Sequence, residues 1–234
     1  MNINHGTLYD EGYVKEIRAG NLIFSSFENN IKFIEYLENN GILNNNLKIL
    51  EIGCGTGYFL NWLQNRGYKY LLGAEVAKSA VDYANKHFNS INFDLIYENE
   101  LHYGNKSFDI VLSFDVVEHI IDQKSHFKRV NEILSSNGYY CFATPLKELD
   151  MLFNVFNRQN KIYHPSLQNK KGLEEICKQL GFSQVDFVKI SHTLSSKQIQ
   201  KIKSKHLGCF IPILNNLMRF NIIPNPTLFV IFRK

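Results

Sequence analysis

The stretch ILEIGCGTGYFL, residues 49–60, decides the fold of this chain. A short apolar run leads into three glycines at alternating positions, Gly53, Gly55 and Gly57, and an apolar helical pattern follows them. Glycine permits positive φ angles and close backbone approach, so the pattern predicts a tight turn from a buried strand into a helix. Such a turn either packs without a ligand or holds one at the N-terminus of the helix.

Strand and helix patterns alternate on both sides of this turn. The predicted strands are 47–52, 69–76, 91–97, 108–115, 138–145, 185–190 and 227–234. The predicted helices are 25–40, 56–66, 77–88, a helix from the fourth strand to about residue 136, and 170–182. This alternation predicts βαβ units and a mostly parallel α/β sheet, which binds ligands beyond the carboxyl ends of its strands.

Composition favours one cytoplasmic domain over residues 1–234. The chain is 44% hydrophobic, enough for a large core, and its net charge of +4 is too small to argue for a nucleic-acid partner. The first residues are polar, and Pro212 and Arg219 interrupt the apolar region near the C-terminus, so we expect no signal peptide and no membrane span. No cysteine pair has zinc-site spacing, so we expect reduced thiols at Cys54, Cys141, Cys177 and Cys209.

Glu51 separates two ligand classes for the glycine turn. A dinucleotide site has the pattern G-x-G-x-x-G, whereas this turn is G-x-G-x-G. A carboxylate two residues before the first glycine repels a pyrophosphate and favours a cationic ligand. A nicotinamide dehydrogenase is therefore the weakest alternative, and NADH binding would revive it.

Three segments and one acidic residue together resemble the class I S-adenosylmethionine-dependent methyltransferases. LEIGCGTG resembles their first motif, and Glu75 follows Gly53 by about 22 residues, where the family has an acid that binds both ribose hydroxyls. YENELHYGNKSFDIVLSFDVVEHI resembles the block from the adenine loop through the fourth strand, and ILSSNGYYCFATP the segment into the fifth. The resemblance covers about residues 45–190.

The resemblance implies a Rossmann-like three-layer fold whose seven strands have the order 3-2-1-4-5-7-6, with the last-formed strand antiparallel. It implies that S-adenosylmethionine binds and S-adenosylhomocysteine is the product. Tyr97 replaces the family's adenine-reading acid, so either Glu98 or Asn99 takes that role, and only Gly138 of a usual glycine pair is present. The expected cofactor-binding residues are Glu51, Gly53, Cys54, Gly55, Gly57, Glu75, Val76, Glu98, Asn99, Phe114 and Asp115.

The segment DVVEHI, 115–120, follows the fourth strand at the ligand edge. Helical spacing predicts that Asp115, Glu118 and His119 share a polar face, opposite an apolar face that includes Ile121. His119 is a candidate base for an acceptor hydroxyl, and His164 follows the fifth strand on the same edge. We expect these two histidines to be the catalytic residues. The alternative is that Glu118 and His119 only bond within the fold.

A second alternative adds a divalent metal held by Asp115, Glu118, His119 and His164. The small-RNA 2′-O-methyltransferases have an E-x-x-E-H plus His arrangement of this kind, and ubiquinone-biosynthesis O-methyltransferases have a similar E-H segment. This chain has Asp in place of the first Glu. We expect a site without a metal, and a metal-assisted RNA ribose 2′-O-methyltransferase is the second candidate enzyme.

Substrate residues are expected from an N-terminal helical cap, 1–44, and from insertions at 146–170 and 191–226. Aromatic and basic side chains there suit a ring-bearing or glycosyl acceptor, or else a lid packed on the core. Lysines and apolar residues at 197–223 suit contact with a membrane surface, or else a solvated face. The aromatic and basic side chains of the cap and the first insertion include Tyr9, Tyr13, Arg18, Phe153, Phe156, Arg158 and Tyr163.

The sequence therefore predicts methyl transfer from S-adenosylmethionine, most directly to an oxygen of a small molecule or glycan. Because the sulfonium leaves as a neutral thioether, in-line positioning supplies much of the rate and a base serves only to remove an acceptor proton. The non-enzyme alternative is a methyltransferase-like binding module, which would bind the cofactor and turn nothing over. The sequence leaves the oligomeric state open.

Overall fold

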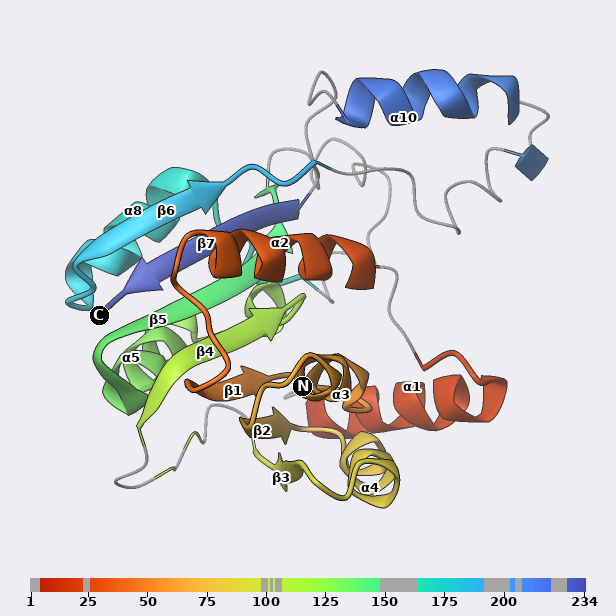
Figure 1. The fold of residues 1–234 in the computed structure, drawn as a ribbon, viewed down its shortest axis with the longest axis horizontal. Coiled ribbons are helices and arrows are strands. Elements are labelled where there is room, and N and C mark those ends of the chain that lie inside the picture. The colour runs from red at the N-terminus through yellow and green to blue at the C-terminus, as the bar shows by residue number, and fades with distance from the viewer. Residues whose placement is uncertain are drawn as a thin grey trace.

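The computed structural model describes residues 5–22, 26–97, 101, 103, 107–147, 164–191, 203–204, 208–219 and 227–234. It contains a seven-stranded sheet in the order β3-β2-β1-β4-β5-β7-β6 (Figure 1). β7 pairs antiparallel with both β5 and β6, and the other pairs are parallel, so the predicted order and the antiparallel last strand are confirmed. The strands are β1 (Lys48–Ile52), β2 (Tyr70–Glu75), β3 (Asn92–Leu95), β4 (Phe108–Phe114), β5 (Leu134–Pro145), β6 (Gln184–Val188) and β7 (Thr227–Arg233).

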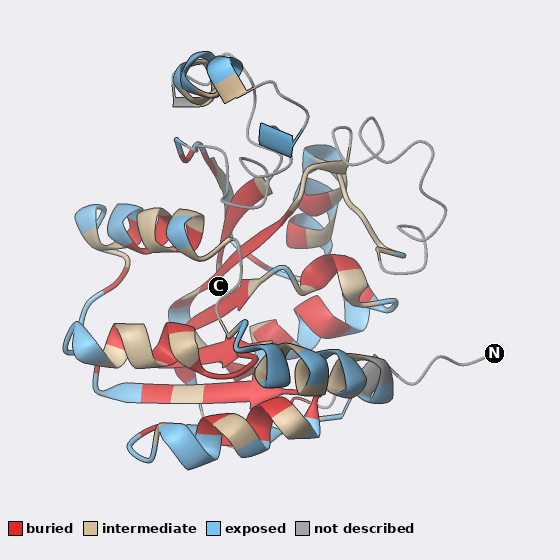
Figure 2. Ribbon diagram, turned by 90° about the vertical axis from the view of Figure 1, so that its right-hand side faces the viewer, coloured by how far each residue is buried: buried red, intermediate tan, exposed pale blue. Residues whose placement is uncertain are grey.

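Helices cover both faces of the sheet and bury its strands between them (Figure 2). One core lies against α2 (Phe27–Asn39), α3 (Tyr58–Asn65) and α4 (Lys78–His87), and the other against α5 (Gln123–Ile133) and α8 (Lys170–Gln179). Ile49 of β1 belongs to the first core and Leu50 to the second, because successive side chains of a strand point to opposite faces. Because both faces of the sheet are covered, the neighbouring residues Ile49 and Leu50 are both apolar and fully buried.

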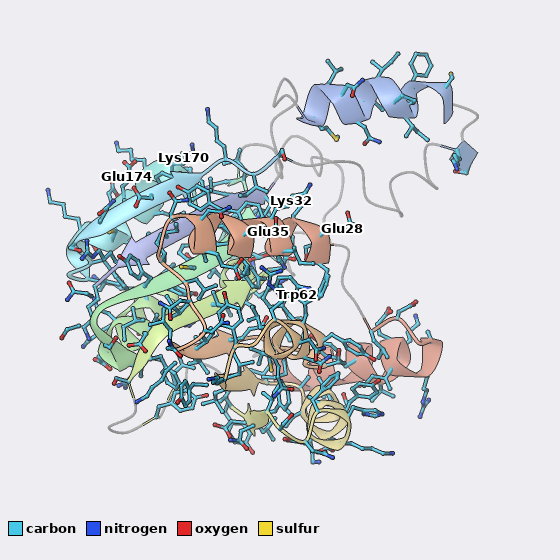
Figure 3. The ribbon with its side chains drawn as sticks, viewed as in Figure 1. Glu28, Lys32, Glu35, Trp62, Lys170 and Glu174 are labelled. Carbon is cyan, nitrogen blue, oxygen red and sulfur yellow. The ribbon has the colours of Figure 1, made fainter. Side chains whose placement is uncertain are left out.

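Helix α2 shows how the sequence pattern fixes a helix in this fold. Phe33 and Leu37 are fully buried against the sheet. Glu28, Lys32 and Glu35 lie along the outer side of the helix (Figure 3). The apolar stripe at helical spacing therefore forms as predicted, and it holds the N-terminal end of α2 beside the carboxyl ends of β1 and β4.

The predicted helix between the fourth strand and residue 136 is wrong at both ends. Asp115 has a left-handed φ of 56°, and residues Val117–His119 form a single 3₁₀ turn, η1, before α5 begins at Gln123. Asp122 caps α5 by accepting a hydrogen bond from the Ser125 N–H at 3.1 Å. β5 already begins at Leu134, four residues before the predicted Gly138.

The break after β4 also overturns the predicted faces of DVVEHI. Glu118 is 1% exposed, although the helical pattern placed it on a polar face, and Ile121 is 70% exposed, although the pattern placed it on an apolar one. A left-handed residue and one tight turn change the direction of each side chain, so α-helical spacing does not apply across this segment.

Helix α1 (His5–Ala19) is the N-terminal cap that the sequence predicted without a helical period. Its Asp10 carboxylate accepts a hydrogen bond from the Ser79 N–H at 2.6 Å, and the Ser79 hydroxyl donates to the Asp10 carbonyl at 3.2 Å. These bonds fasten α1 to the first turn of α4, where N–H groups lack partners inside the helix. α1 thus lies across the carboxyl ends of β1 and β2.

The two late insertions fall largely outside the described residues. Within the second insertion, η2 (Gly208–Phe210) leads into α10 (Ile211–Arg219), which lies away from the sheet (Figure 1) and contributes no buried residue to the described core. In the described part of the chain, no helix is both long and apolar enough to span a membrane.

Candidate functional site

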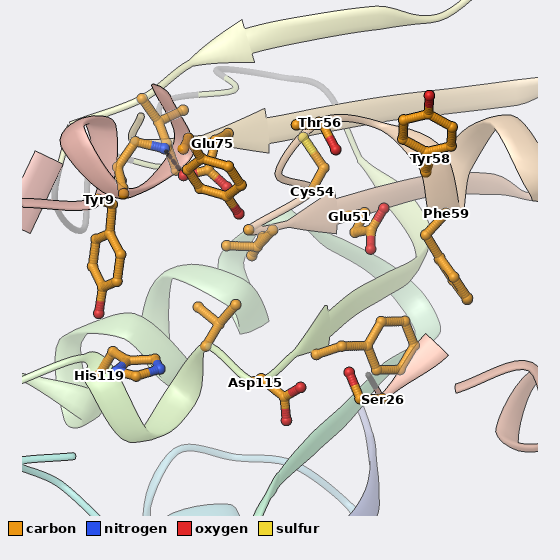
Figure 4. A pocket seen from close by; sticks show the side chains of 18 of the residues that line it. Tyr9, Ser26, Glu51, Cys54, Thr56, Tyr58, Phe59, Glu75, Asp115 and His119 are labelled. Atoms are coloured by element: carbon orange, nitrogen blue, oxygen red, sulfur yellow. Dashed lines mark hydrogen bonds between the residues drawn. The ribbon is translucent and has the colours of Figure 1, made fainter. Parts of the chain in front are cut away.

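A cavity of about 590 Å³ opens at the carboxyl ends of β1, β2 and β4, the edge where such sheets bind ligands. Its walls come from the turns after these strands, the N-terminal end of α2, and α1 (Figure 4). The predicted cofactor residues Glu98 and Asn99 lie outside the described residues. The predicted cofactor residues that line the cavity are Glu51, Gly53, Cys54, Glu75, Val76, Phe114 and Asp115.

The glycine turn satisfies most of its N–H groups inside the protein. Gly53 and Cys54 both donate to the carbonyl of Ala74, at 2.7 and 3.2 Å. Gly57 donates to the carbonyl of Cys54 at 3.0 Å. The sequence suggested that the N–H groups of this turn face a ligand carboxylate, and these three do not.

Backbone shape and packing require glycine at two of the three positions. Gly53 has a φ of 74°, and a Cβ there would lie 2.3 Å from Cγ2 of Val116. Gly57 has a φ of 82°, and a Cβ there would lie 2.7 Å from the Phe93 ring. Both glycines would therefore be required even if the turn held no ligand, so their presence alone does not show that the turn binds one.

Glu75 fixes the turn from the end of β2. Its Oε2 accepts the Gly55 N–H at 2.9 Å, and its Oε1 accepts the N–H groups of Val76 and Ala77 at 2.8 and 3.0 Å. Burial raises the pKa of this carboxyl group, and the three N–H bonds oppose that shift. Because Oε2 carries a single N–H bond, it keeps a lone pair with which to accept from a ligand hydroxyl.

Glu51 is the buried carboxylate that the fold leaves least satisfied. Its side chain is 3% exposed, and no hydrogen-bond donor among the described residues reaches Oε2. Burial and the nearby Glu75 carboxylate raise the pKa of Glu51 to about 8. Two carboxylates lining one cavity create a site that favours a cation, because a positive ligand would restore the charge that burial suppresses.

Asp115 reaches the cavity through the left-handed bend after β4. Its side chain stays open to the cavity, yet the surrounding protein raises its pKa by displacing water, while a hydrogen bond from Ser26 and the charge of His164 oppose the rise. Figure 4 shows Ser26 and Asp115 side by side at the cavity wall. This pair offers polar groups to the part of the cavity that α2 covers.

His119 lines the cavity from turn η1 and is packed on two sides. Its ring lies edge-on to Tyr9 at 5.7 Å and to His164 at 5.0 Å, measured between ring centroids. His119 Nε2 lies 3.9 Å from Oε1 of Glu118. His164, the second predicted catalytic residue, contacts His119 but does not line the cavity.

Three of the four side chains considered for a metal gather here. Glu118, His119 and His164 offer ligand atoms within 4.8 Å of one another, and Asp115 does not belong to this group within the described part of the chain. Glu118 is buried, and its Oε2 accepts a hydrogen bond from the Thr144 hydroxyl at 3.2 Å. The same grouping also serves hydrogen bonding to His119 without an ion.

Sequence reasoning missed the contribution of α2 to the cavity. Ser26, Phe27 and Asn30 all line it, and the Asn30 side chain is 5% exposed. Asn30 Oδ1 has no hydrogen-bond partner among the described residues. The signal was present, because Asn30 follows Phe27 and precedes Phe33 at helical spacing, so a polar side chain interrupts the apolar stripe.

Of the substrate residues predicted in the N-terminal cap, two line the cavity and one does not. Tyr9 and Tyr13 of α1 line the cavity, and burial raises the pKa of Tyr13. Arg18 is not among the lining residues. The predicted residues of the first insertion lie outside the described residues: Phe153, Phe156, Arg158 and Tyr163.

Comparisons with known proteins agree with this geometry. The family model described as "Methyltransferase domain" matches residues 25–186, more than half of the chain. The ubiquinone biosynthesis O-methyltransferase of Pelagibacter ubique is 29% identical over 107 residues, which cover 44% of each chain. The O-methyltransferase cnsE of Penicillium expansum is 22% identical over 68% of this chain and 61% of its own. The chain thus spans about half the length of the curated relatives it matches.

Solved structures show the same fold. An S-adenosylmethionine-dependent methyltransferase from Archaeoglobus fulgidus superposes with a TM-score of 0.58 at 20% identity, covering 87% of this chain and 93% of its own. A Haemonchus contortus phosphoethanolamine N-methyltransferase 2, solved with S-adenosyl-L-methionine, superposes with a TM-score of 0.59 at 18% identity, covering 87% of this chain and 51% of its own.

Proposed function

This chain belongs to the class I S-adenosylmethionine-dependent methyltransferases, and from that premise we propose that it moves a methyl group to a hydroxyl oxygen of a small molecule or sugar. The observation that carries the proposal is Glu51, a buried carboxylate on a cavity of about 590 Å³, with one oxygen that no donor among the described residues reaches. A ligand with an ammonium or sulfonium group supplies the charge this site lacks. A pyrophosphate does not.

The residues of the cavity fit both ends of S-adenosylmethionine. Glu75, held by three N–H bonds, would accept from a ribose hydroxyl, as an ionised carboxylate suits a vicinal diol. Glu51 would pair with the ammonium, and Asn30, whose Oδ1 is also unpartnered among the described residues, would accept from the same donor-rich region. When bound, the cofactor supplies a methyl group whose leaving group is a neutral thioether.

The protein's own contribution to methyl transfer is positioning and removal of one proton. Holding an acceptor in line inside a closed cavity accounts for up to about 7–11 kcal/mol of barrier in well-oriented systems. A hydroxyl acceptor must also lose its proton, and His119 is the imidazole that lines the cavity. The Glu118 carboxylate 3.9 Å from Nε2 would stabilise the imidazolium that results.

The acceptor half of the cavity suits a ring that carries a hydroxyl group. Leu22, Phe27, Phe114 and Ile120 line it with apolar surface, and His119 and Asp115 add polar groups. Two curated relatives are named O-methyltransferases, which supports oxygen as the acceptor atom.

The acceptor class is tested with methyl-labelled S-adenosylmethionine and four probes: a catechol, a simple phenol, an alkyl glycoside and an aromatic amine of matched size. We expect label to pass to a hydroxyl probe, and turnover to fall by about 10²–10⁴-fold in H119A, the range of a lost general base. Transfer to the amine alone, or unchanged turnover in H119A, would contradict oxygen transfer with His119 as base.

The proposed reaction uses no metal, and this too is testable. Removing divalent ions with a chelator should leave both turnover and S-adenosylhomocysteine affinity unchanged, because His119 and Glu118 act by proton transfer and charge. A chelator-sensitive rate restored by added Mn²⁺ or Zn²⁺ would instead favour the group of Glu118, His119 and His164 as ion ligands.

A further inference from the structure

The buried amide of Gln123 connects two segments that meet beside the cavity. Gln123 is the first residue of α5 and is 5% exposed. Its Nε2 donates to the Val117 carbonyl of turn η1 at 2.6 Å and to the Ser166 carbonyl at 2.7 Å. Its Oε1 accepts from Gln168 Nε2 at 3.0 Å. Both N–H bonds of the amide are therefore directed at backbone carbonyls 49 residues apart in sequence.

Two further bonds join the same segments. The Ser166 N–H donates to the Glu118 carbonyl at 3.2 Å, and the Ser166 hydroxyl donates to the Ile121 carbonyl at 3.3 Å. Gln123 lies at the centre of this junction because it alone among these residues contacts η1 and both ends of the 166–168 segment. The junction fixes where residue 164 can lie relative to residue 119.

Gln123 is not needed to cap the N-terminus of α5. The first residues of a helix are usually capped by a side chain, and here Asp122 does so through the Ser125 N–H. The Gln123 amide is thus committed to the junction, and its burial is costly unless all three of its bonds form.

We propose that Gln123 is a positioning residue, which holds His164 against His119 and so fixes the ring orientation of the proposed base. The inference rests on the proposed function for its catalytic meaning. His164, which does not line the cavity, packs edge-on to His119 at 5.0 Å, and Tyr9 packs edge-on to the same ring at 5.7 Å. Loosening the 164–168 segment removes the first of these two supports and leaves the cofactor end of the cavity untouched.

The test compares Q123L with N131L. Asn131 also lies on α5 and also donates its side-chain amide to a backbone carbonyl, that of Leu180 at 2.9 Å, but far from η1. It therefore controls for the loss of a partly buried bond from a side-chain amide to a backbone carbonyl on the same helix. Q123E, which keeps the side-chain size but directs a carboxylate at two carbonyls, is the second variant if Q123L does not fold.

The first readout needs no acceptor. In the unmodified protein, NMR should show a nuclear Overhauser contact between the two imidazole rings, assigned with H119Q and H164Q. We expect Q123L or Q123E to lose this contact and N131L to keep it, with S-adenosylhomocysteine affinity within twofold of the unmodified protein in every case. A retained contact in both Gln123 variants would overturn the proposal. So would a large fall in S-adenosylhomocysteine affinity in the variants that lose the contact, because the change would then not be confined to the two rings.

The second readout is a double-mutant cycle on turnover with the best hydroxyl probe. We expect Q123L to lower kcat at least tenfold with little change in cofactor KM, and to lower it no further in an H164A background, because both changes act through the same ring. Multiplying effects of Q123L and H164A would overturn the positioning role. A protein that fails to bind S-adenosylhomocysteine would refute the proposed function, while the ring contact and its dependence on Gln123 would still be decided by NMR.

Discussion

At the scale of the residue, Glu51 illustrates how a stable fold retains an unfavourable group. Burial raises its pKa to about 8, so in the ligand-free protein this carboxyl group is largely protonated at neutral pH. A carboxyl group whose pKa is higher in the folded than in the unfolded state lowers stability as pH rises from its unfolded value through 8. The group is therefore expected to be kept for its ligand and not for the fold.

Cofactor binding should release a proton through Glu51. An ammonium bound beside the carboxylate lowers its pKa, so below pH 8 the site must lose a proton to bind. We expect S-adenosylhomocysteine affinity to rise between pH 6 and 8 by up to about tenfold per unit, and to level off above. Calorimetry in buffers of different ionisation enthalpy measures the released proton.

E51Q is the matched control for this proton release. It should bind more weakly, release no proton and be more stable than the unmodified protein above pH 8 when no ligand is present. An E51Q protein with the same pH slope would assign the slope to another group, and the pairing of Glu51 with the ammonium would then be wrong.

Gly53 tests whether the glycine turn depends on packing. Gly53→Ala forces both a left-handed alanine, at about 1–2 kcal/mol, and a contact of 2.3 Å with Val116. Gly41→Ala has a similar φ of 69° and nothing within 4 Å of the added Cβ, so it isolates the backbone cost. We expect G53A to lose about 1–3 kcal/mol more than G41A in urea unfolding. Equal losses would mean that the turn tolerates the contact.

At the scale of the element, helix α1 closes the cavity, and its bonds to α4 hold α1 in that position. Tyr9 and Tyr13 face the ligand space from α1, and Asp10 bonds the first turn of α4. D10A removes an acceptor from an N-terminal N–H and should cost about 1 kcal/mol. We therefore expect S-adenosylhomocysteine to leave several times faster in stopped-flow displacement from D10A than from the unmodified protein.

D10N is the control for this anchor, since it keeps an oxygen acceptor and loses only the charge near the helix N-terminus. Its effect should be less than half that of D10A. If D10A and the unmodified protein release the ligand at the same rate, α1 does not act as a closing element.

Some elements of this fold could be predicted from the sequence and others could not. The strands and the core face of α2 followed from periodicity, since buried strands and amphipathic helices repeat over many residues, whereas the strand order followed from the family resemblance. The segment 115–122 did not, because one left-handed residue, Asp115, and a single 3₁₀ turn leave no periodic trace. Gln123 escaped notice because its partners, Val117 and Ser166, are backbone carbonyls that carry no residue identity.

At the scale of the whole molecule, the sheet brings three turns that are distant in sequence to one edge. Glu51 lies near the carboxyl end of β1, Glu75 ends β2 and Asp115 follows β4, so the strand order places all three around one cavity. Helix α1 and the N-terminal end of α2 then close it from the N-terminal side of the chain. A ligand that fills this space binds the folded chain alone and should raise stability by about 2.7 kcal/mol at a hundredfold excess over Kd.

The most direct test of the account is calorimetric titration of the purified protein with S-adenosylhomocysteine, with NADH as the control ligand. We expect one site per chain with micromolar affinity for S-adenosylhomocysteine and no heat from NADH, because Glu51 opposes a pyrophosphate and attracts an ammonium. Binding of NADH, or no binding of S-adenosylhomocysteine, would contradict the central claim that this cavity holds the methyl donor.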